Sequence, residues 1–371
     1  MTPLELTPPR PLRNAVRGFT LVELMIALTL GLLIVAGVTS LFIGMRASYS
    51  FQDGLSRVQE NGRFAIQTLG RGLRMSGFTG CTNNIVNWLN PAGTGYVTSI
   101  YGNRAVTGWE ATGTGPGDNY TVGDASNWQS SSGEGLAAEI NNPLSGSDIV
   151  VINTTEPLDV VLQGNPGPPA NALTAAGNTG IPQGAIIVAV TASCSGGDLF
   201  MKTSDGNAVS LPKGTAAGQN PGNINPAGGF SQDHDDNSLI YQHLSTAYFV
   251  RNNPATPPEP ALYRLRLDDA RRTGTPNPQE LVSGIENMQI LYGEDTDGDR
   301  TANTYRAADS VVSWNRVVSV RMALLLRNDS FVQTESDLRA FDVAYTNVTP
   351  VEDGRVRQVM TLTVALRNRL P

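Results

Sequence analysis

The hydrophobic positions of the chain begin with one long uninterrupted run. Residues 24–45 are 22 residues without a charged side chain, and they follow Glu23 directly. At 1.5 Å per residue, a helix of this length crosses a hydrocarbon layer of about 30 Å. Three arginines precede the run, so the positive-inside rule leaves residues 1–18 in the cytoplasm. The pattern predicts a transmembrane helix over residues 19–45 that is followed by a periplasmic C-terminal part.

The next segment, residues 46–80, has the pattern of an amphipathic helix. Its apolar residues recur at steps of mostly three and four, and its charged residues occupy the opposite face. Gly77 suits the C-terminal end of such a helix. Counted from Thr20 to Ser76, the two segments would form one helix of 57 residues, about 85 Å long. We expect the apolar face of its second half to pack on a globular head.

The remaining hydrophobic positions have the patterns of strands. Segment 81–237 is rich in loops, with 24 Gly and 18 Asn, and segment 238–371 contains longer runs that alternate polar and apolar residues. Arginines in the later runs, Arg321 and Arg357 among them, are expected on the solvated face of a sheet. Strands are predicted over residues 148–153, 158–162, 185–190, 246–250, 261–267, 287–292, 316–326 and 357–366.

These patterns together predict an α+β fold. A long N-terminal helical spine, with a membrane half and an amphipathic half, would pack on an antiparallel β-sheet head that carries a Gly/Asn-rich β insertion.

Composition and charge narrow the function. The 371-residue chain has a formal net charge of −7, so it lacks the basic excess of a general nucleic-acid binder. It has two histidines, and neither lies in a recognisable nucleophile motif. The Gly-rich stretches lack the Lys-Ser/Thr pair of a phosphate-binding loop. We therefore expect no enzymatic activity and no nucleic-acid partner.

Glu23 is the unusual residue of the N-terminal segment. A carboxylate inside an apolar membrane helix costs about 2.5–3.5 kcal/mol on insertion scales, so it needs a partner. Cleavage after Gly18 would create an α-amino group on Phe19 that could supply a cation. In an assembly of parallel helices, this amine and the Glu23 of a neighbouring subunit could neutralise each other. We therefore assign a role in assembly to Glu23.

The segment Arg17-Gly18-Phe19-Thr-Leu-Val-Glu23-Leu resembles the class III signal of type IV pilins and pseudopilins. The shared features are a basic leader that ends in Gly, an aromatic first mature residue and a Glu at mature position five. The resemblance implies cleavage between Gly18 and Phe19 by a prepilin peptidase and N-methylation of Phe19. Residues 1–18 would then be a cleaved cytoplasmic leader.

Three further segments, 63–81, 281–299 and 314–327, resemble the PilW family of minor pilins. This resemblance implies a subunit that primes pilus assembly with other minor pilins, near the fibre tip and beneath a tip adhesin. The implied partners also include the major pilin and an inner-membrane assembly platform. The chain would reside in the inner membrane as a single-pass protein before it enters the cell-surface pilus, with roles in adhesion and twitching motility. The middle segment, 81–237, is not matched.

Two other functions remain open. The same processing signal occurs in pseudopilins of type II secretion systems, and an uncleaved helix would anchor a periplasmic binding protein or hydrolase.

Cys81 and Cys194 are the only cysteines of the chain. In an oxidising compartment they would form one disulfide that closes a loop of more than 100 residues, worth about 4.7 kcal/mol in the chain-entropy model. The alternative is two separate buried thiols.

The acidic residues Asp295, Asp297 and Asp299 alternate along a short turn. Three carboxylates at this spacing can direct oxygens at Ca²⁺, as in the first half of an EF-hand loop, although later positions of that motif are not matched. The alternative is an acidic solvated turn. Residues 233–236, Asp-His-Asp-Asp, are a weaker metal candidate, and His243 is expected to be structural. Ca²⁺ is the single cofactor that the sequence suggests.

Overall fold

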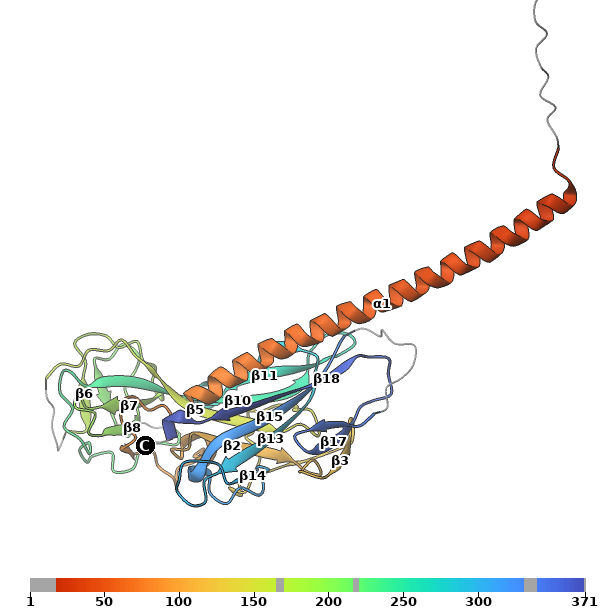
Figure 1. Ribbon diagram of the computed structural model, residues 1–371. Helices are drawn as coiled ribbons and strands as arrows, with labels where there is room; N and C mark the ends of the chain where they lie inside the picture. Colours follow the sequence, from red (N-terminus) through yellow and green to blue (C-terminus); the bar gives the residue numbers. More distant parts are fainter. Residues whose placement is uncertain (1–17, 165–169, 216–219, 330–338, 370–371) are drawn as a thin grey trace, which may run out of the picture. The chain divides into compact units, whose positions relative to one another are not determined.

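The computed structural model describes residues 18–164, 170–215, 220–329 and 339–369 (Figure 1). The chain forms two compact units, Met1–Gln52 and Asp53–Pro371, which are described here one after the other. Helix α1 (Leu21–Met75) contributes to both units.

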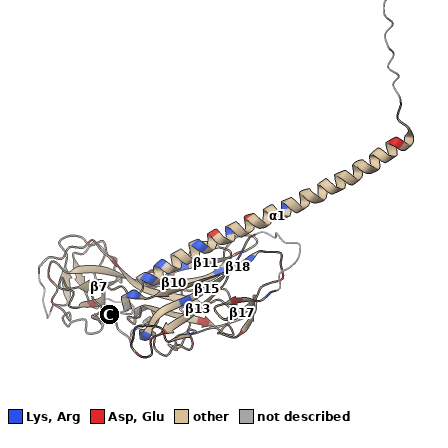
Figure 2. Cartoon of the chain, viewed as in Figure 1, with Lys and Arg blue, Asp and Glu red and all other residues tan. Residues whose placement is uncertain are grey.

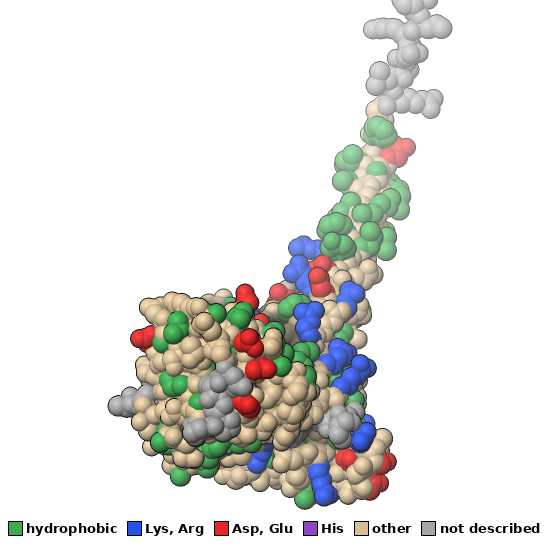
Figure 3. All heavy atoms as spheres, turned by 90° about the vertical axis from the view of Figure 1, so that its left-hand side faces the viewer, with side chains coloured by type: hydrophobic (Ala, Val, Ile, Leu, Met, Phe, Trp, Pro, Cys, Tyr) green, Lys and Arg blue, Asp and Glu red, His purple; other side chains and the backbone are tan. Residues whose placement is uncertain are grey.

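The first unit consists of the apolar half of α1. Its large hydrophobic side chains are exposed, as the green side chains on this part of the helix in Figure 3 show. The most apolar 18-residue stretch of α1 has a mean hydropathy of 2.5, and none of its residues is buried. Within the described residues, α1 is the one helix that is long and apolar enough to cross a membrane. The predicted helix is thus confirmed.

In the second unit, the remaining turns of α1 pack on a sheet. The buried face includes Val58, Ala65, Leu69 and Leu73, whereas the arginines lie on the exposed face (Figure 2). Gly62 allows close packing, because a Cβ atom there would lie 2.3 Å from Sδ of Met360 on the sheet. The helix ends at Met75, and the N–H of Gly77, two residues further on, donates to the carbonyl of Asn153 at 2.8 Å. The amphipathic pattern therefore predicted the packed face correctly.

The largest sheet joins strands from both sequence segments of the head. In the described part of the chain it has nine strands: seven in the order β1-β8-β7-β10-β5-β2-β4, with β11 paired to β10 and β12 paired to β11. All neighbours are antiparallel except β1 and β8. The strands are β1 (Ile85–Asn87), β2 (Val106–Ala111), β4 (Trp128–Gln129), β5 (Ile149–Pro157), β7 (Ile186–Val190), β8 (Gly197–Met201), β10 (Leu239–Asn252), β11 (Pro260–Arg266) and β12 (Gln279–Ser283).

A second sheet has its strands in the order β14-β13-β15-β18 and packs against α1. Its other face contacts a three-stranded sheet, β16-β17-β3. The elements are β13 (Ile285–Glu294), β14 (Thr304–Arg306), β15 (Val317–Arg327), β18 (Arg357–Ala365), β16 (Phe341–Val343), β17 (Thr346–Thr349) and β3 (Asn119–Thr121). The short elements β6 (Ala172–Thr174), β9 (Ser210–Pro212), α2 (Thr98–Tyr101) and α3 (Leu267–Thr273), with the 3₁₀ turns Trp314–Arg316 and Arg367–Arg369, complete the described fold.

The α+β class is confirmed, and two local predictions are wrong. Residues 158–162 form no strand, because only Leu162 makes an isolated bridge, to Ala175. Arg357 does not line a solvated face: its side chain is buried and paired with Glu286 at 2.6 Å and with Asp353 at 2.7 Å. The alternation along β18 could not reveal these carboxylates, because Glu286 lies on β13 and Asp353 lies in the loop just before β18.

The division into segments 1–18, 19–45, 46–80, 81–237 and 238–371 stays a prediction. In the structure, β5 from the fourth segment pairs along most of its length with β10 from the fifth. The change in composition near residue 237 therefore does not separate two sheets, because strands from both sides of it belong to the same sheet.

Candidate functional site

The start of α1 brings Thr20 and Glu23 together. The N–H and the hydroxyl of Thr20 donate to Oε2 of Glu23 at 3.0 and 2.9 Å, and the N–H of Glu23 donates to Oγ1 of Thr20 at 3.2 Å. These reciprocal contacts form a capping box, which satisfies N–H groups that have no partner within the helix. The sequence reasoning considered a cation for Glu23 and missed this cap, although the Thr-x-x-Glu spacing is its usual signal.

The predicted processing junction lies directly before this cap. Phe19 is 89% exposed, and a Cβ atom added at Gly18 would meet nothing within 4 Å. Both residues are thus exposed. The preceding leader residues, 1–17, lie outside the described residues, so cleavage and methylation stay predictions.

Cys81 and Cys194 form a disulfide, with their Cα atoms 5.5 Å apart. The bond joins the segment after α1 to the loop between β7 and β8, and both cysteines are exposed. Next to it, the amide of Asn84 donates to the carbonyl of Ser195 at 3.0 Å. The disulfide therefore fixes β1 beside β8, and the alternative of two buried thiols is wrong.

The three aspartates of the predicted calcium turn lie close together. One carboxylate oxygen from each of Asp295, Asp297 and Asp299 lies within 4.8 Å of the others. Burial is the largest single influence on Asp295 and acts to raise its pKa, but hydrogen bonds from the N–H groups of Gly298 and Arg300, at 2.6 and 2.9 Å, together outweigh it and lower the pKa. These donors already neutralise part of the negative charge, so the acidic solvated turn and the calcium site both remain compatible with the geometry.

The second metal candidate, residues 233–236, does not gather its side chains. His234 is buried, and its Nε2 atom lies 2.7 Å from Oδ2 of Asp198. Oδ1 of the same aspartate accepts from Nε1 of Trp88 at 2.6 Å. Within the described ranges, the aspartates at 295, 297 and 299 are the one group of metal-ligating side chains that comes together. His243 is also buried, its Nε2 atom lies 2.9 Å from the carbonyl oxygen of Ile100, and burial lowers its pKa.

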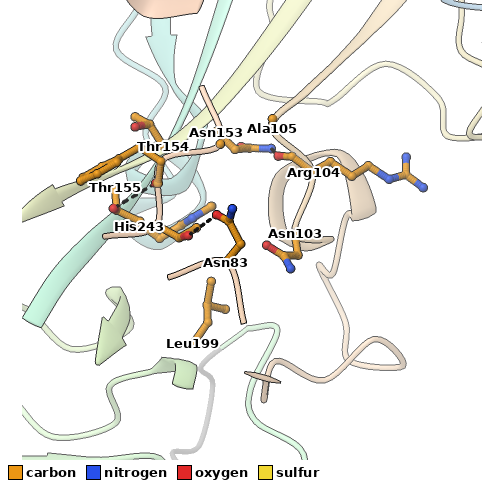
Figure 4. Close-up of a pocket in the computed structure, with 12 residues that line it drawn as sticks. Asn83, Asn103, Arg104, Ala105, Asn153, Thr154, Thr155, Leu199 and His243 are labelled. Carbon is orange, nitrogen blue, oxygen red and sulfur yellow. Dashed lines mark hydrogen bonds between the residues drawn. The ribbon is translucent and has the colours of Figure 1, made fainter. Parts of the chain in front are cut away.

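A small pocket lies next to the end of α1 and is shown in Figure 4. Asn83, Asn153, Thr155, Leu199 and His243 are among its lining residues. The space that can hold the centres of water molecules is about 40 Å³, enough for about three waters. The pocket is therefore too small for an organic substrate of ordinary size.

Sequence reasoning missed a buried pair of acids, Glu110 on β2 and Asp148 just before β5. They are 3% and 1% exposed, and their side chains are hydrogen-bonded to each other. Asp148 also accepts from the N–H groups of Ala111 at 2.9 Å and Ile290 at 2.8 Å. Burial raises the pKa of Asp148 to about 7 and raises that of Glu110 well above its ordinary value. No local sequence signal marks this pair, since 37 residues separate Asp148 from its backbone partner at 111.

Comparison with known protein families agrees with both ends of the chain. Residues 13–39 match the prokaryotic N-terminal methylation motif, and residues 247–368 match the model of the type IV pilus-assembly protein W, PilW. No curated protein and no solved structure shows significant similarity to the chain.

The methylation motif, together with the exposed apolar helix and the β-rich head, is typical of a prepilin-like protein. With the match of residues 247–368, these features support a type IV pilus minor pilin that is similar to PilW. The family suggests a structural, non-enzymatic protein that interacts with other pilus components. The N-terminal signal and the apolar helix fit membrane anchoring and a place in the pilus.

Proposed function

We propose that this minor pilin primes pilus assembly together with other minor pilins and stays near the fibre tip, beneath a tip adhesin. Before assembly it spans the inner membrane once, with residues 1–18 in the cytoplasm and the head in the periplasm. Prepilin peptidase cleaves after Gly18, and Phe19 is N-methylated. The chain then passes through the inner-membrane assembly platform and contacts other minor pilins and the major pilin.

The size of the second unit carries this proposal. Asp53–Pro371 is a single compact unit of more than 300 residues. Packed helices approach to about 8–10 Å, so subunits that repeat along a helical fibre have little room for their heads. A head of this size fits a subunit of low abundance at the end of the fibre, where no further layer of subunits has to pack above it.

Glu23 supports incorporation into the fibre. Its carboxylate accepts only from Thr20 among the described residues, and the cleaved chain would place the Phe19 amine of a neighbouring subunit within an apolar helical core. In that setting an unpaired carboxylate is costly, whereas an ammonium–carboxylate pair is much less so.

The charge and the cap can be separated with two variants. Glu23→Ala removes both the cap and the charge, whereas Glu23→Gln keeps an oxygen that can accept from Thr20 but is neutral. We expect both variants to fold normally in the head and to be depleted from sheared fibres about tenfold or more, which corresponds to about 1.4 kcal/mol. Normal incorporation of Glu23→Gln would show that the helix cap, not charge pairing, is what assembly requires.

The function itself is tested on sheared surface fibres of the producing cells. Mass spectrometry should find an N-terminal methyl-Phe19 peptide at a few copies per fibre, and gold-labelled antibody against the head should mark fibre ends. Deletion should reduce the number of fibres. An intact Met1 in the inner-membrane fraction would instead indicate an anchored periplasmic protein. Unchanged piliation together with a loss of protein secretion would indicate a pseudopilin.

A further inference from the structure

The hairpin between β16 and β17 turns through two residues in an unfavourable backbone conformation. Val343 pairs with Thr346, so Ala344 and Tyr345 are the whole loop, and their φ angles are 53° and 72°. Positive φ at both central positions defines a turn that normally takes Asn-Gly. In the left-handed region the Cβ atom crowds the backbone, so Ala and especially Tyr are strained here.

Folding of the head does not explain the tyrosine. Its side chain is 55% exposed. Its N–H donates to Oδ1 of Asp342 at 2.7 Å and its carbonyl accepts from the N–H of Gly117 at 2.8 Å. A glycine at position 345 would make the same two backbone contacts without the strain.

Among the described residues, the side chain of Tyr345 makes one hydrogen bond, to Arg321 on β15. Nη1 of Arg321 donates to the Tyr345 hydroxyl at 2.9 Å, and this contact is exposed to solvent. The guanidinium carbon lies 4.2 Å from the centre of the Tyr305 ring and 5.8 Å from that of Tyr345. Arg321 has no salt bridge to a carboxylate within the part of the chain that the structure describes. The exposed aromatic ring therefore lies beside a half-buried cation without an anionic partner.

Tyrosine and arginine are the residue types that most often anchor protein interfaces, where removal of one anchor commonly costs much of the affinity. Strain that folding does not require is found mainly at functional positions. We propose that Tyr345 and Arg321 form the anchor of an interface with a neighbouring pilus subunit. That subunit receives the Tyr345 ring in an apolar recess and places a carboxylate against Arg321. This inference rests on the proposed function, because it requires the head to contact another subunit.

A protein partner fits this site better than a glycan. The guanidinium of Arg321 lies over the ring of Tyr305, whereas the ring of Tyr345 is exposed. Among the residues that the structure describes, no acidic side chain forms an ion pair with Arg321 that would supply the mixed donors and acceptors of a sugar site. An isolated ring with an adjacent cation is instead suited to insertion into a recess on a folded partner.

Site-specific photocrosslinking in the full-length chain tests the contact directly. A benzoylphenylalanine at position 345 should crosslink to another pilus subunit in sheared fibres. The same group at Val209, which is exposed to a similar degree at 46%, should not. A product at position 345 that contains no protein and is sensitive to periodate would overturn the proposal in favour of a glycan.

Two glycine variants separate the interface from the fold. Tyr345→Gly should leave the melting temperature of the detergent-solubilised chain unchanged or raise it by about 2 °C, yet reduce its amount in fibres about tenfold. Ala344→Gly relieves strain next to it and keeps the ring, so it should enter fibres normally. A fall of several degrees in the melting temperature of Tyr345→Gly would show that the ring serves folding and would overturn the proposal.

The interface at Tyr345 and the proposed pilus function can be refuted separately. If the unmodified chain is present in fibres but position 345 crosslinks to no subunit, the interface proposal alone is wrong. If the unmodified chain is absent from fibres, the proposed function fails as well.

Discussion

The buried acids Glu110 and Asp148 should make the head less stable as the pH rises. In an unfolded chain Asp148 has a pKa near its ordinary 3.8, whereas in the folded head its pKa is raised to about 7. A group whose folded pKa is raised stabilises the fold most fully below its unfolded pKa, and this contribution is lost as the pH rises through the folded pKa. We therefore expect the free energy of unfolding to fall as the pH rises from 4 to about 7.

The size of the effect follows from the shift. At about 1.4 kcal/mol per pKa unit, the change for Asp148 corresponds to about 2–4 kcal/mol, allowing for proton sharing with Glu110. In a unit of this size, that is about 4–8 °C in melting temperature. The nearby hydroxyl of Tyr292 has no hydrogen-bond partner among the described residues and supplies no cation. The local surroundings therefore do not compensate a second negative charge.

Thermal melts of the detergent-solubilised chain between pH 5 and pH 8 measure this dependence. Glu110→Gln keeps an oxygen for the Thr114 hydroxyl, which donates to Oε1 of Glu110 at 3.3 Å, but removes one of the two ionisable groups. We expect it to flatten the pH profile by at least half and to raise the melting temperature at pH 8. Glu60→Gln, at an exposed site on α1, is the matched control and should keep the wild-type slope. A flat wild-type profile, or an equally steep profile for Glu110→Gln, would refute the reasoning.

Three further outcomes are expected. Reduction of the disulfide, or the Cys81→Ser variant, should destabilise the head by about 3–5 kcal/mol, because the covalent closure of a loop over 113 residues is lost. Chemical denaturation measures this loss, and equal stability with and without reductant would contradict it. Gly62→Leu should destabilise the head by about 1–3 kcal/mol or more, because the new side chain clashes with Met360. Gly44→Leu is the control, since a Cβ atom there meets nothing within 4 Å. Equal melting temperatures for the two variants would count against close packing of α1. The predicted calcium site requires that millimolar Ca²⁺ raise the melting temperature of the wild type by a few degrees but not that of Asp297→Asn, and an absent shift would leave only the acidic turn.

Much of the architecture was accessible from the sequence because its signals are local. The uncharged run after Glu23 and the spacing of Val58, Leu69 and Leu73 require only neighbours along one helix. The disulfide was predictable because the chain has a single pair of cysteines. Strand patterns gave the location of the main sheets but not the order of their strands, since that order depends on pairing between distant segments.

The residues that were missed or misplaced depend on such distant segments. Arg357 is buried because Glu286, on another strand, supplies its counter-charge. Glu110 and Asp148 come together only when β2 and β5 pair. By contrast, the cap between Thr20 and Glu23 depends only on residues three positions apart, so it was predictable from the sequence.

The strained turn at Tyr345 and the buried acid pair of Glu110 and Asp148 both contact one segment, the loop after β2. The Thr114 hydroxyl donates to Glu110, and the carbonyl of Thr114 accepts from the hydroxyl of Thr346, next to Tyr345. The same loop provides the N–H of Gly117 that binds the Tyr345 carbonyl. The chain uses glycine at many positive-φ turns and keeps most acids at its surface, so composition does not force either a strained tyrosine or a buried acid pair. Natural proteins usually keep strained residues and buried acids at functional positions. Partner contacts should therefore be sought first at this end of the head, before the small pocket beside α1.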